Sequence, residues 1–248
     1  MRLTVLGCAG SFPGPQSACS AYLLEADGFK LLIDFGTGSL GALQRYSDLY
    51  GLDAILLTHL HPDHFLDACS YIVARRYCPW GPLPAVLLYG PTGVATRLHT
   101  AYGSDEDSLD DVYDFRELTP GPIRIGPFGI VTELMDHPVE TYGLRVTHDG
   151  RTFAYSSDTG PCQALHNIAL GADVLLCEAS YLDQPDNPPH LHLSGRDAGE
   201  NATKAGVKRL LVTHLVQAWG DERRTVEEVR SAYAGPLEVV RAGSVYDI

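Results

Sequence analysis

The sequence predicts a mixed α/β fold made of two similar halves. Within residues 53–102, strand-like and helix-like segments alternate in the order strand, helix, strand, helix, a pattern typical of α/β proteins. Each half also carries a strong hairpin signal, Asp27-Gly28 in the first half and Asp149-Gly150 in the second. A chain of 248 residues with 45% hydrophobic content can bury one large core, so we expect a single domain over residues 1–248.

The first half is predicted to open with an antiparallel meander, followed by helices that cover the sheet. Residues 7–15 are rich in glycine and proline, and we expect this loop to line a site. A phosphate-binding loop is the alternative, although no Gly-Lys-Ser or Gly-Lys-Thr follows it. The expected strands are residues 2–6, 21–26, 30–35, 53–58 and 85–89, and the expected helices are residues 40–50, 65–77 and 93–102.

The second half is predicted to repeat this order, with a hairpin before alternating helices and strands. A capping signal, Ser194 with Asp197 three residues later, opens a helix that runs to Lys204. Residues 103–111 carry the strongest acidic run, which we interpret as a solvated loop. The expected strands are residues 112–118, 123–135, 142–147, 151–156, 173–177, 210–213 and 237–241, and the further helices are residues 162–170 and 222–233.

Composition narrows the class of protein. The formal charge of −13, from 18 Lys and Arg against 31 Asp and Glu, disfavours an extended nucleic acid as partner, because binding one neutralises many phosphates. The six cysteines include no C-x-x-C pair, so we expect them to be reduced and structural. No secretory segment opens the chain and it has no run of about eighteen apolar residues, which predicts a cytoplasmic protein without a membrane partner.

Residues 58–64, T-H-L-H-P-D-H, hold the most specific signal in the chain. Three imidazoles and one carboxylate lie close together there, and neutral imidazole and ionised carboxylate suit Zn²⁺, Mn²⁺ or Fe²⁺. His59 and His61 share strand parity and are expected to hold one ion, while Asp63 and His64 face a second. The alternative is that these side chains only cap the helix that follows.

Three further candidate ligands come directly after expected strands, and with them the set suffices for a dinuclear site. The complete set is His59, His61, Asp63, His64, His137, Asp158 and His214. We predict that it holds two divalent metal ions bridged by Asp158, with zinc as the leading candidate and manganese or iron as alternatives. Asp34, also at a strand end, is expected to orient a ligand. Each of the three later residues, taken alone, is also compatible with a core histidine or a helix cap.

These residues resemble the motifs of the metallo-β-lactamase superfamily along almost the whole chain, with Ile33-Asp34 as the first motif and residues 58–64 as the second. The resemblance implies a four-layer αββα sandwich with the metals at one edge between the sheets. The closer similarity is to the ribonuclease Z and phosphodiesterase branch. Residues 137–146 are similar to its H-x-V-x-x-Y-G-Y-R-I motif, and residues 177–181 (C-E-A-S-Y) are similar to its H-E-A-T-F motif.

The resemblance also implies a mechanism, in which a hydroxide that bridges the metals attacks the scissile bond. Asp63, besides being a ligand, is expected to orient this nucleophile or take its proton. His192 is the candidate proton donor to the leaving group and is oriented by Glu178, like the corresponding pair of the endonuclease branch. For His190 and His192, the alternative is that both are surface loop histidines.

For the substrate, we expect a small phosphodiester, with cyclic nucleotides as the leading candidates. Residues 192–199 are similar to a segment of small bacterial relatives regarded as cyclic-nucleotide phosphodiesterases, and no insertion resembles the tRNA-binding arm of the endonucleases. Phe12, Tyr142 and Tyr181 are the side chains expected to contact the base. The alternatives are a tRNA 3′-endonuclease, a lactone or thioester hydrolase, and a non-catalytic metal scaffold. The oligomeric state stays open, with a homodimer as one outcome.

Overall fold

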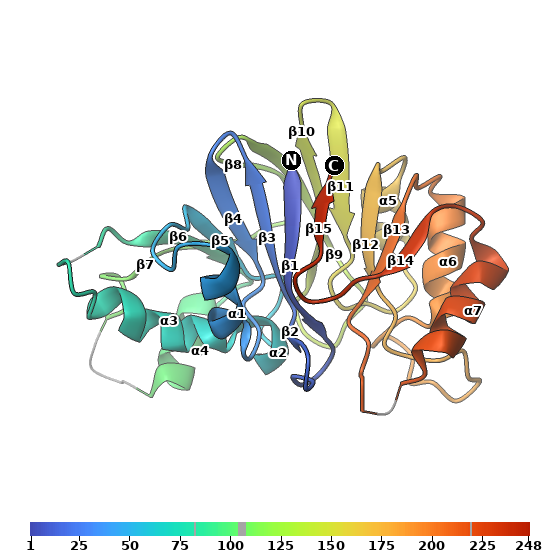
Figure 1. Cartoon of the computed structure of the whole chain (residues 1–248), viewed down its shortest axis with the longest axis horizontal. Helices are drawn as coiled ribbons and strands as arrows, with labels where there is room; N and C mark the ends of the chain where they lie inside the picture. Colours follow the sequence, from blue (N-terminus) through green and yellow to red (C-terminus); the bar gives the residue numbers. More distant parts are fainter. Residues whose placement is uncertain (82, 104–107, 219) are drawn as a thin grey trace.

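A computed structural model describes residues 1–81, 83–103, 108–218 and 220–248. Two β-sheets face each other, and helices cover the outer face of each sheet (Figure 1). The result is a four-layer αββα sandwich, which confirms the predicted fold class. The two ends of the chain meet in the first sheet, where the amino group of Met1 donates to Ile248 O at 3.2 Å.

The first sheet begins with the expected antiparallel meander and continues with parallel strands. In spatial order its strands are β15 (Val245–Asp247), β1 (Arg2–Ala9), β3 (Ala21–Ala26), β4 (Phe29–Ile33), β5 (Ala54–Leu56), β6 (Val86–Gly90) and β7 (Tyr113–Glu117), and β2 (Ala18–Cys19) pairs with β1. Its helices are α1 (Ser39–Tyr46), α2 (Pro62–Phe65), α3 (Asp67–Arg76) and α4 (Val94–Tyr102). Helices α1, α3 and α4 cover its outer face, and α2 lies at the lower edge (Figure 1).

The second sheet mirrors this arrangement, with antiparallel strands at one side and parallel strands at the other. In spatial order its strands are β14 (Leu237–Val239), β13 (Leu210–Thr213), β12 (Val174–Glu178), β11 (Arg151–Tyr155), β10 (Tyr142–His148), β9 (Phe128–Leu134) and β8 (Gly121–Ile125). Its outer face is covered by α5 (Gln163–Ala169), α6 (Gly195–Lys204) and α7 (Glu222–Ala232).

Alternation along the strands explains the layers. In β3, Tyr22 and Leu24 face the space between the two sheets, whereas Leu23 faces the helices. In β12, Leu176 faces the other sheet and Leu175 faces the helices. Successive side chains of a strand point to opposite faces, and both faces are covered here, so the inner strands are apolar at almost every position.

One predicted helix ends earlier in the structure than expected, for a local reason. Residues 40–50 were expected to be helical, but α1 ends at Tyr46 and Ser47 is extended. The Asp48 side chain accepts a hydrogen bond from Tyr50 N at 3.2 Å. Such a bond from an aspartate to the backbone two residues later favours a turn over a helix.

A second boundary matters for the site, because the helix expected over residues 65–77 is divided. Asp63 and His64 lie inside the short helix α2, and α3 begins anew at Asp67. Phe35 causes the break: its N–H donates to His64 O at 2.6 Å, and its carbonyl accepts from Asp67 N at 3.0 Å. The strand end after β4 therefore holds α2 in place.

The remaining differences are smaller. The strand-like sequence over residues 123–135, with its expected interruption at Gly126-Pro127, forms the hairpin of β8 and β9, which turns there, whereas β2 and β15 were not predicted. In the acidic run, residues 104–107 lie outside the described residues. The capping box of Ser194 and Asp197 is present as predicted. No helix in the described ranges is long and apolar enough to cross a membrane.

Two glycines allow the backbone to come close to the lower edge of the sheets. A Cβ atom at Gly36 would lie 1.9 Å from Asp63 O, and a Cβ atom at Gly10 would lie 2.4 Å from His214 O. Since both neighbours are backbone atoms, neither can move aside cheaply. These two positions therefore require glycine for the loops to pack.

Gly36→Ala is expected to lower the free energy of unfolding by about 1–3 kcal/mol, the usual scale of overpacking, and to weaken metal binding because Asp63 must shift. The control is Gly41→Ala in α1, where nothing lies within 4 Å of the new Cβ. That change should raise stability by about 0.5–1 kcal/mol, because alanine favours the helix. Urea unfolding and metal titration measure both effects, and wild-type behaviour of Gly36→Ala would contradict the close approach.

Candidate metal centre

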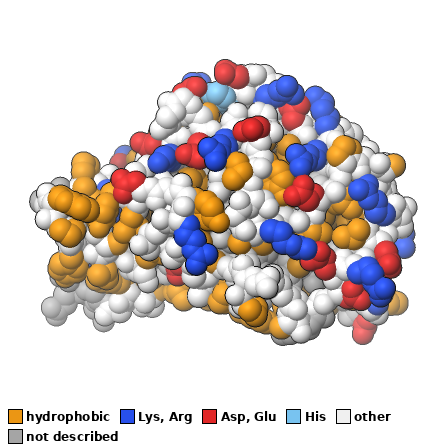
Figure 2. Space-filling view, viewed as in Figure 1, with side chains coloured by type: hydrophobic (Ala, Val, Ile, Leu, Met, Phe, Trp, Pro, Cys, Tyr) orange, Lys and Arg blue, Asp and Glu red, His pale blue; other side chains and the backbone are white. Residues whose placement is uncertain are grey.

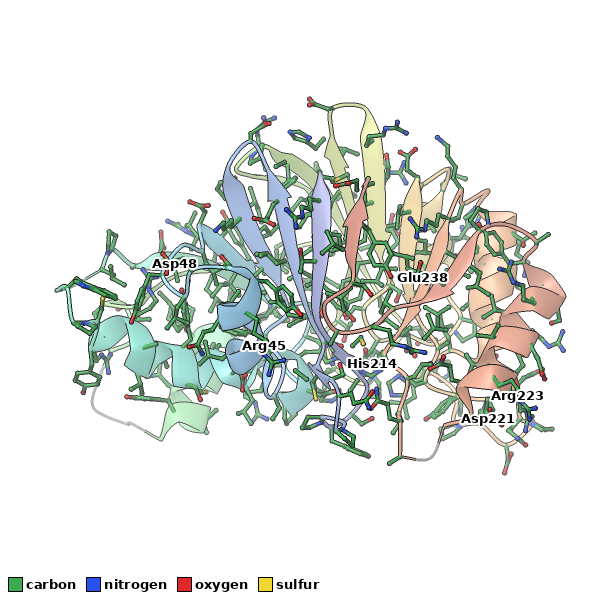
Figure 3. The ribbon with its side chains drawn as sticks, viewed as in Figure 1. Arg45, Asp48, His214, Asp221, Arg223 and Glu238 are labelled. Atoms are coloured by element: carbon green, nitrogen blue, oxygen red, sulfur yellow. The ribbon has the colours of Figure 1, made fainter. Side chains whose placement is uncertain are left out.

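The predicted ligands converge at the lower edge of the sandwich, between the two sheets, where His214 is labelled in Figure 3. They form two groups that share Asp158, and within each group the potential ligand atoms lie within 4.8 Å of one another. One group is His59, His61, His137 and Asp158, and the other is Asp63, His64, Asp158 and His214. The structure thus brings together all seven predicted residues. His59 and His61 lie in one group and Asp63 and His64 in the other, as predicted, and Asp158 is common to both groups.

Each ligand is delivered by a strand end or by the short helix. His59 and His61 follow β5, and Asp63 and His64 lie in α2. Three more strands supply the remaining residues: His137 follows β9, Asp158 follows β11 and His214 follows β13. Strands of both sheets end at this edge, and for that reason residues far apart in the chain become neighbours.

The imidazoles are oriented from outside the cluster. His64 Nδ1 lies 2.8 Å from Asp34 Oδ2, His214 Nδ1 lies 2.8 Å from Ser180 Oγ, and His137 Nδ1 lies 2.9 Å from Leu191 O. In each ring the other nitrogen, Nε2, faces the cluster. An outer hydrogen bond that fixes the ring and its tautomer is the usual support of a metal-binding histidine.

Two inward-facing atoms indicate that the cluster suits a cation. His59 Nε2 and Asp158 Oδ1 are both buried and have no hydrogen-bond partner among the described residues. Asp158 Oδ1 does lie 3.3 Å from His64 Nε2 and 3.4 Å from His214 Nε2, but without hydrogen-bond geometry. Buried polar atoms are rarely left unsatisfied. Two unpaired ligand atoms at the centre of the cluster fit a bound divalent metal, which agrees with the nitrogen and oxygen ligand set.

The ionisation of the cluster also suits metal binding. Burial lowers the pKa of His59, His61 and His137, so these rings are neutral, the form that binds metal. Burial opposes ionisation of Asp63, but the nearby His64 and His214 outweigh it and hold the pKa of this carboxyl below its usual range. The group around His59 therefore offers neutral nitrogens. In the other group, burial opposes protonation of His64, but Asp158, Asp34 and Asp63 outweigh it and raise the pKa of His64, so a cation bound there would replace its proton.

Asp34 has the orienting position that the sequence predicted. Its buried carboxylate accepts hydrogen bonds from Thr58 N at 2.8 Å and Tyr155 OH at 3.0 Å, besides its contact with His64. Sequence reasoning missed several partners of the ligands, namely Thr58, Tyr155, Ser157 and Ser180. The available signal was their position in the chain: Thr58 and Ser157 are next to a ligand, Ser180 is two residues after Glu178, and Tyr155 is three residues before Asp158.

Backbone strain is concentrated at the site. Among the described residues other than glycine, seven have positive φ, and two of these, Asp27 and Asp149, lie in the hairpin turns. The other five surround the metal cluster: Ser11, Asp34, Ser157, His190 and His214. Each such residue costs about 1–3 kcal/mol, and such strain often accumulates at functional sites.

The predicted proton donor lies beside the ligands. The His192 ring centroid is 5.7 Å from that of His137 and 5.5 Å from that of His214. Its Nδ1 lies 2.9 Å from Oε1 of the buried Glu178. Burial alone would lower the pKa of His192, but Glu178 outweighs it and raises the pKa to about 9. His190, by contrast, is exposed and pairs with Asp136 at 2.8 Å.

Of the three side chains predicted to contact a base, the prediction for Tyr142 is wrong. Tyr142 is only 2% exposed, packs in the core between the sheets and donates from its hydroxyl to Leu118 O, so it cannot line a substrate site. Tyr181 packs edge-on against His192 with ring centroids 5.3 Å apart. Phe12 is exposed, one residue after Ser11, whose N–H donates to Asp63 Oδ2 at 2.8 Å.

Comparison with known sequences gives a consistent result. The family model described as beta-lactamase superfamily domain matches residues 30–215. The chain is 46% identical to the uncharacterized protein ML1173 of Mycobacterium leprae, over all of this chain and 89% of that protein. It is 29% identical to the probable metallo-hydrolase YhfI of Bacillus subtilis over the full length of both. Identity to ribonuclease Z of Mycobacterium bovis BCG is 30%, over 96% of this chain and 95% of that enzyme.

Solved structures show the same similarity. The crystal structure of YhfI from Bacillus subtilis has a TM-score of 0.88 at 27% identity and covers 99% of this chain and 98% of its own. The short form of human tRNase Z has a TM-score of 0.80 at 22% identity, with 100% and 99% covered. A diphosphatase of the PhnP family has a TM-score of 0.78 at 19% identity, with 100% and 97% covered. At such low identity the last two show the fold alone.

Two metal ions per chain are expected, because the ligands form two groups around one shared carboxylate. Elemental analysis after loading with excess zinc or manganese measures the ratio, and a value that stays near one would contradict the dinuclear site. Asp158→Ala should disturb both ions, since it removes the shared ligand. Asp136→Ala is the matched control, because that carboxylate pairs with His190 and belongs to neither group, so it should leave the ratio unchanged.

Proposed function

Because the chain belongs to the beta-lactamase superfamily and is a metal-dependent hydrolase, we propose that it cleaves small phosphodiesters, with 3′,5′-cyclic nucleotides as the leading substrates. One observation carries this proposal: a histidine–glutamate pair, His192 with Glu178, stands beside two groups of metal ligands that share Asp158. Phosphodiester cleavage needs both a nucleophile and a proton for the leaving oxygen, and these two parts supply them.

The nucleophilic part depends on the ligand cluster. Two bound divalent ions would supply hydroxide at neutral pH and neutralise charge on the phosphate oxygens. Asp63 Oδ2 is held by Ser11 N at 2.8 Å and lies 3.2 Å from His214 Nε2. This carboxylate is ionised and fixed in direction, so it is suited to orient a water molecule or to accept its proton.

His192 provides the acid part. A ribose alkoxide is a poor leaving group, and a positioned acid that protonates it contributes about 10²–10⁴-fold to the rate. Glu178 accepts from His192 Nδ1, which leaves Nε2–H as the donating end of the ring. With a pKa raised to about 9 by Glu178, His192 carries its proton at neutral pH.

Electrostatics favours a small substrate over a folded RNA. The chain carries a formal charge of −13, and basic and acidic side chains are interspersed on the face shown in Figure 2. Several arginines are held in ion pairs, such as Arg196 with Asp183 and Arg209 with Glu238. Tight RNA binding needs Lys and Arg contacts to many phosphates, whereas one phosphodiester needs only the metal cluster. We infer a cytoplasmic site of action, in keeping with six free cysteines.

Processing of tRNA 3′ ends is the second candidate, because ribonuclease Z of Mycobacterium bovis BCG is 30% identical over almost the full chain. The deciding comparison is kcat/KM for 3′,5′-cyclic AMP against a precursor tRNA, with matched salt and metal. We expect the cyclic nucleotide to be cleaved more efficiently. Accurate 3′ processing of the tRNA at the higher efficiency would overturn the assignment in favour of the endonuclease.

His192→Ala is expected to retain the metals but to slow cleavage of cyclic AMP by about 10²-fold or more, the scale of a lost general acid. The loss should be far smaller on bis-p-nitrophenyl phosphate, because nitrophenolate leaves without protonation. His190→Ala is the matched control, since His190 lies in the same loop and is exposed, and it should keep nearly full activity on both substrates. Equal losses on both substrates in His192→Ala would exclude the acid role.

A further inference from the structure

We infer that Ser180 is a positioning residue that joins the two parts of the site, because its hydroxyl contacts both a metal ligand and the acid pair. Ser180 Oγ lies 2.8 Å from His214 Nδ1 and 2.8 Å from Glu178 Oε2. It thus connects His214 to Glu178, which in turn holds His192. The part of this inference that concerns His192 rests on the proposed function, whereas the part that concerns metal binding does not.

The His214 contact sets which nitrogen can bind metal. His214 Nε2 lies 3.2 Å from Asp63 Oδ2 and 3.4 Å from Asp158 Oδ1, so this nitrogen faces the cluster. For Nε2 to offer its lone pair to a metal, the proton must lie on Nδ1. Ser180 Oγ accepts a hydrogen bond from this N–H. The bond stabilises the His214 tautomer that metal binding requires.

The single hydroxyl proton of Ser180 then has two acceptors within reach, Glu178 Oε2 at 2.8 Å and His214 O at 3.0 Å. The carboxylate is closer and charged, and charge-assisted hydrogen bonds are the stronger ones. Ser180 therefore accepts from His214 and donates to Glu178. This gives the hydrogen bonds one direction, from the metal ligand toward the acid pair.

Glu178 is fixed by these contacts. It is completely buried, and it accepts from Thr159 N at 2.9 Å, from Ser180 N at 3.1 Å, from the Ser180 hydroxyl and from His192 Nδ1 at 2.9 Å. A carboxylate has about four acceptor positions, so all are used. Removing the Ser180 hydroxyl frees one of them on Oε2, so the carboxylate that orients His192 is held less firmly.

The other side of Ser180 lines a cavity of about 520 Å³. Cys8, Ser17 and Thr225 line it as well, and Asp221, labelled in Figure 3, stands at its border beside α7. Because Ser180 lines this cavity, Ser180→Thr is the variant that keeps the hydroxyl and adds one methyl group beside it. The conservative variant is therefore a rescue test that separates the hydroxyl from simple packing.

Ser180→Ala is expected to weaken the binding of one of the two metal ions by about 10–100-fold, the usual effect of losing a group that orients a ligand. The affected ion is the one beside His214, and the ion held by His59, His61 and His137 should keep its affinity. Competition with a chromophoric zinc chelator measures both affinities without any substrate. Ser180→Thr should restore the wild-type values.

Ser17→Ala is the matched control. Ser17 is buried and lines the same cavity, but within the described part of the chain its hydroxyl bonds only to Cys8 N and Ala18 O at the backbone and to the Cys8 thiol. It should therefore leave both metal affinities unchanged even if the melting temperature falls. Wild-type metal affinities in a folded Ser180→Ala, or affinities in a folded Ser180→Thr as weak as those of Ser180→Ala, would overturn the inference.

The link from Ser180 to His192 is tested separately, by comparing kcat on two substrates. At saturating metal, Ser180→Ala should lose more kcat on cyclic AMP than on bis-p-nitrophenyl phosphate, as His192→Ala does, and Ser180→Thr should recover the difference. If His192→Ala shows this difference and Ser180→Ala does not, the link from Ser180 to the acid is wrong. If neither shows it, the proposed acid is wrong, and the metal affinities still decide the link to His214.

Discussion

The buried Asp158 carboxylate is the constraint on which the rest of the site depends. Its Oδ1 has no hydrogen bond, although imidazole nitrogens of His64 and His214 lie 3.3–3.4 Å away. Burying a charge is very costly unless positive charge lies beside it. His64 and His214 lie within ion-pair distance of this carboxylate, and a cation held by the surrounding ligands would compensate it further. The two sheets meet at this carboxylate because β11 delivers Asp158 while β5 and β13 end on either side of it.

The outer contacts extend this constraint into the fold. Asp34, just after β4, contacts the His64 ring. The next residue, Phe35, donates its N–H to His64 O at the end of α2 and accepts from Asp67 N at the start of α3. The same strand end therefore orients a ligand and places the helix that carries it. Rigid support of this kind matters because small displacements of a ligand weaken both metal binding and catalysis.

In the proposed function, the metal cluster and the general acid are linked through Ser180 and Glu178. Glu178 is the centre of this arrangement, since it accepts from His192 on one oxygen and from Ser180 on the other. A charge at Glu178 raises the pKa of His192, while Ser180 transmits the orientation to His214. These hydrogen bonds would hold the proposed acid in a fixed position relative to the metal ligands.

The sequence by itself determined the ligand types, their division into two groups and the α/β architecture. Residues 58–64 and the strand-end residues His137, Asp158 and His214 can be recognised from their side-chain chemistry and from the strand pattern before them. Both are local properties of the sequence. Only the tertiary structure decided which atoms orient them. Ser180 and His214 are 34 residues apart, and Tyr155 and Asp34 are 121 apart. Such contacts follow from how strand ends meet in space, as does the burial of Tyr142, because local patterns do not specify which loops become neighbours.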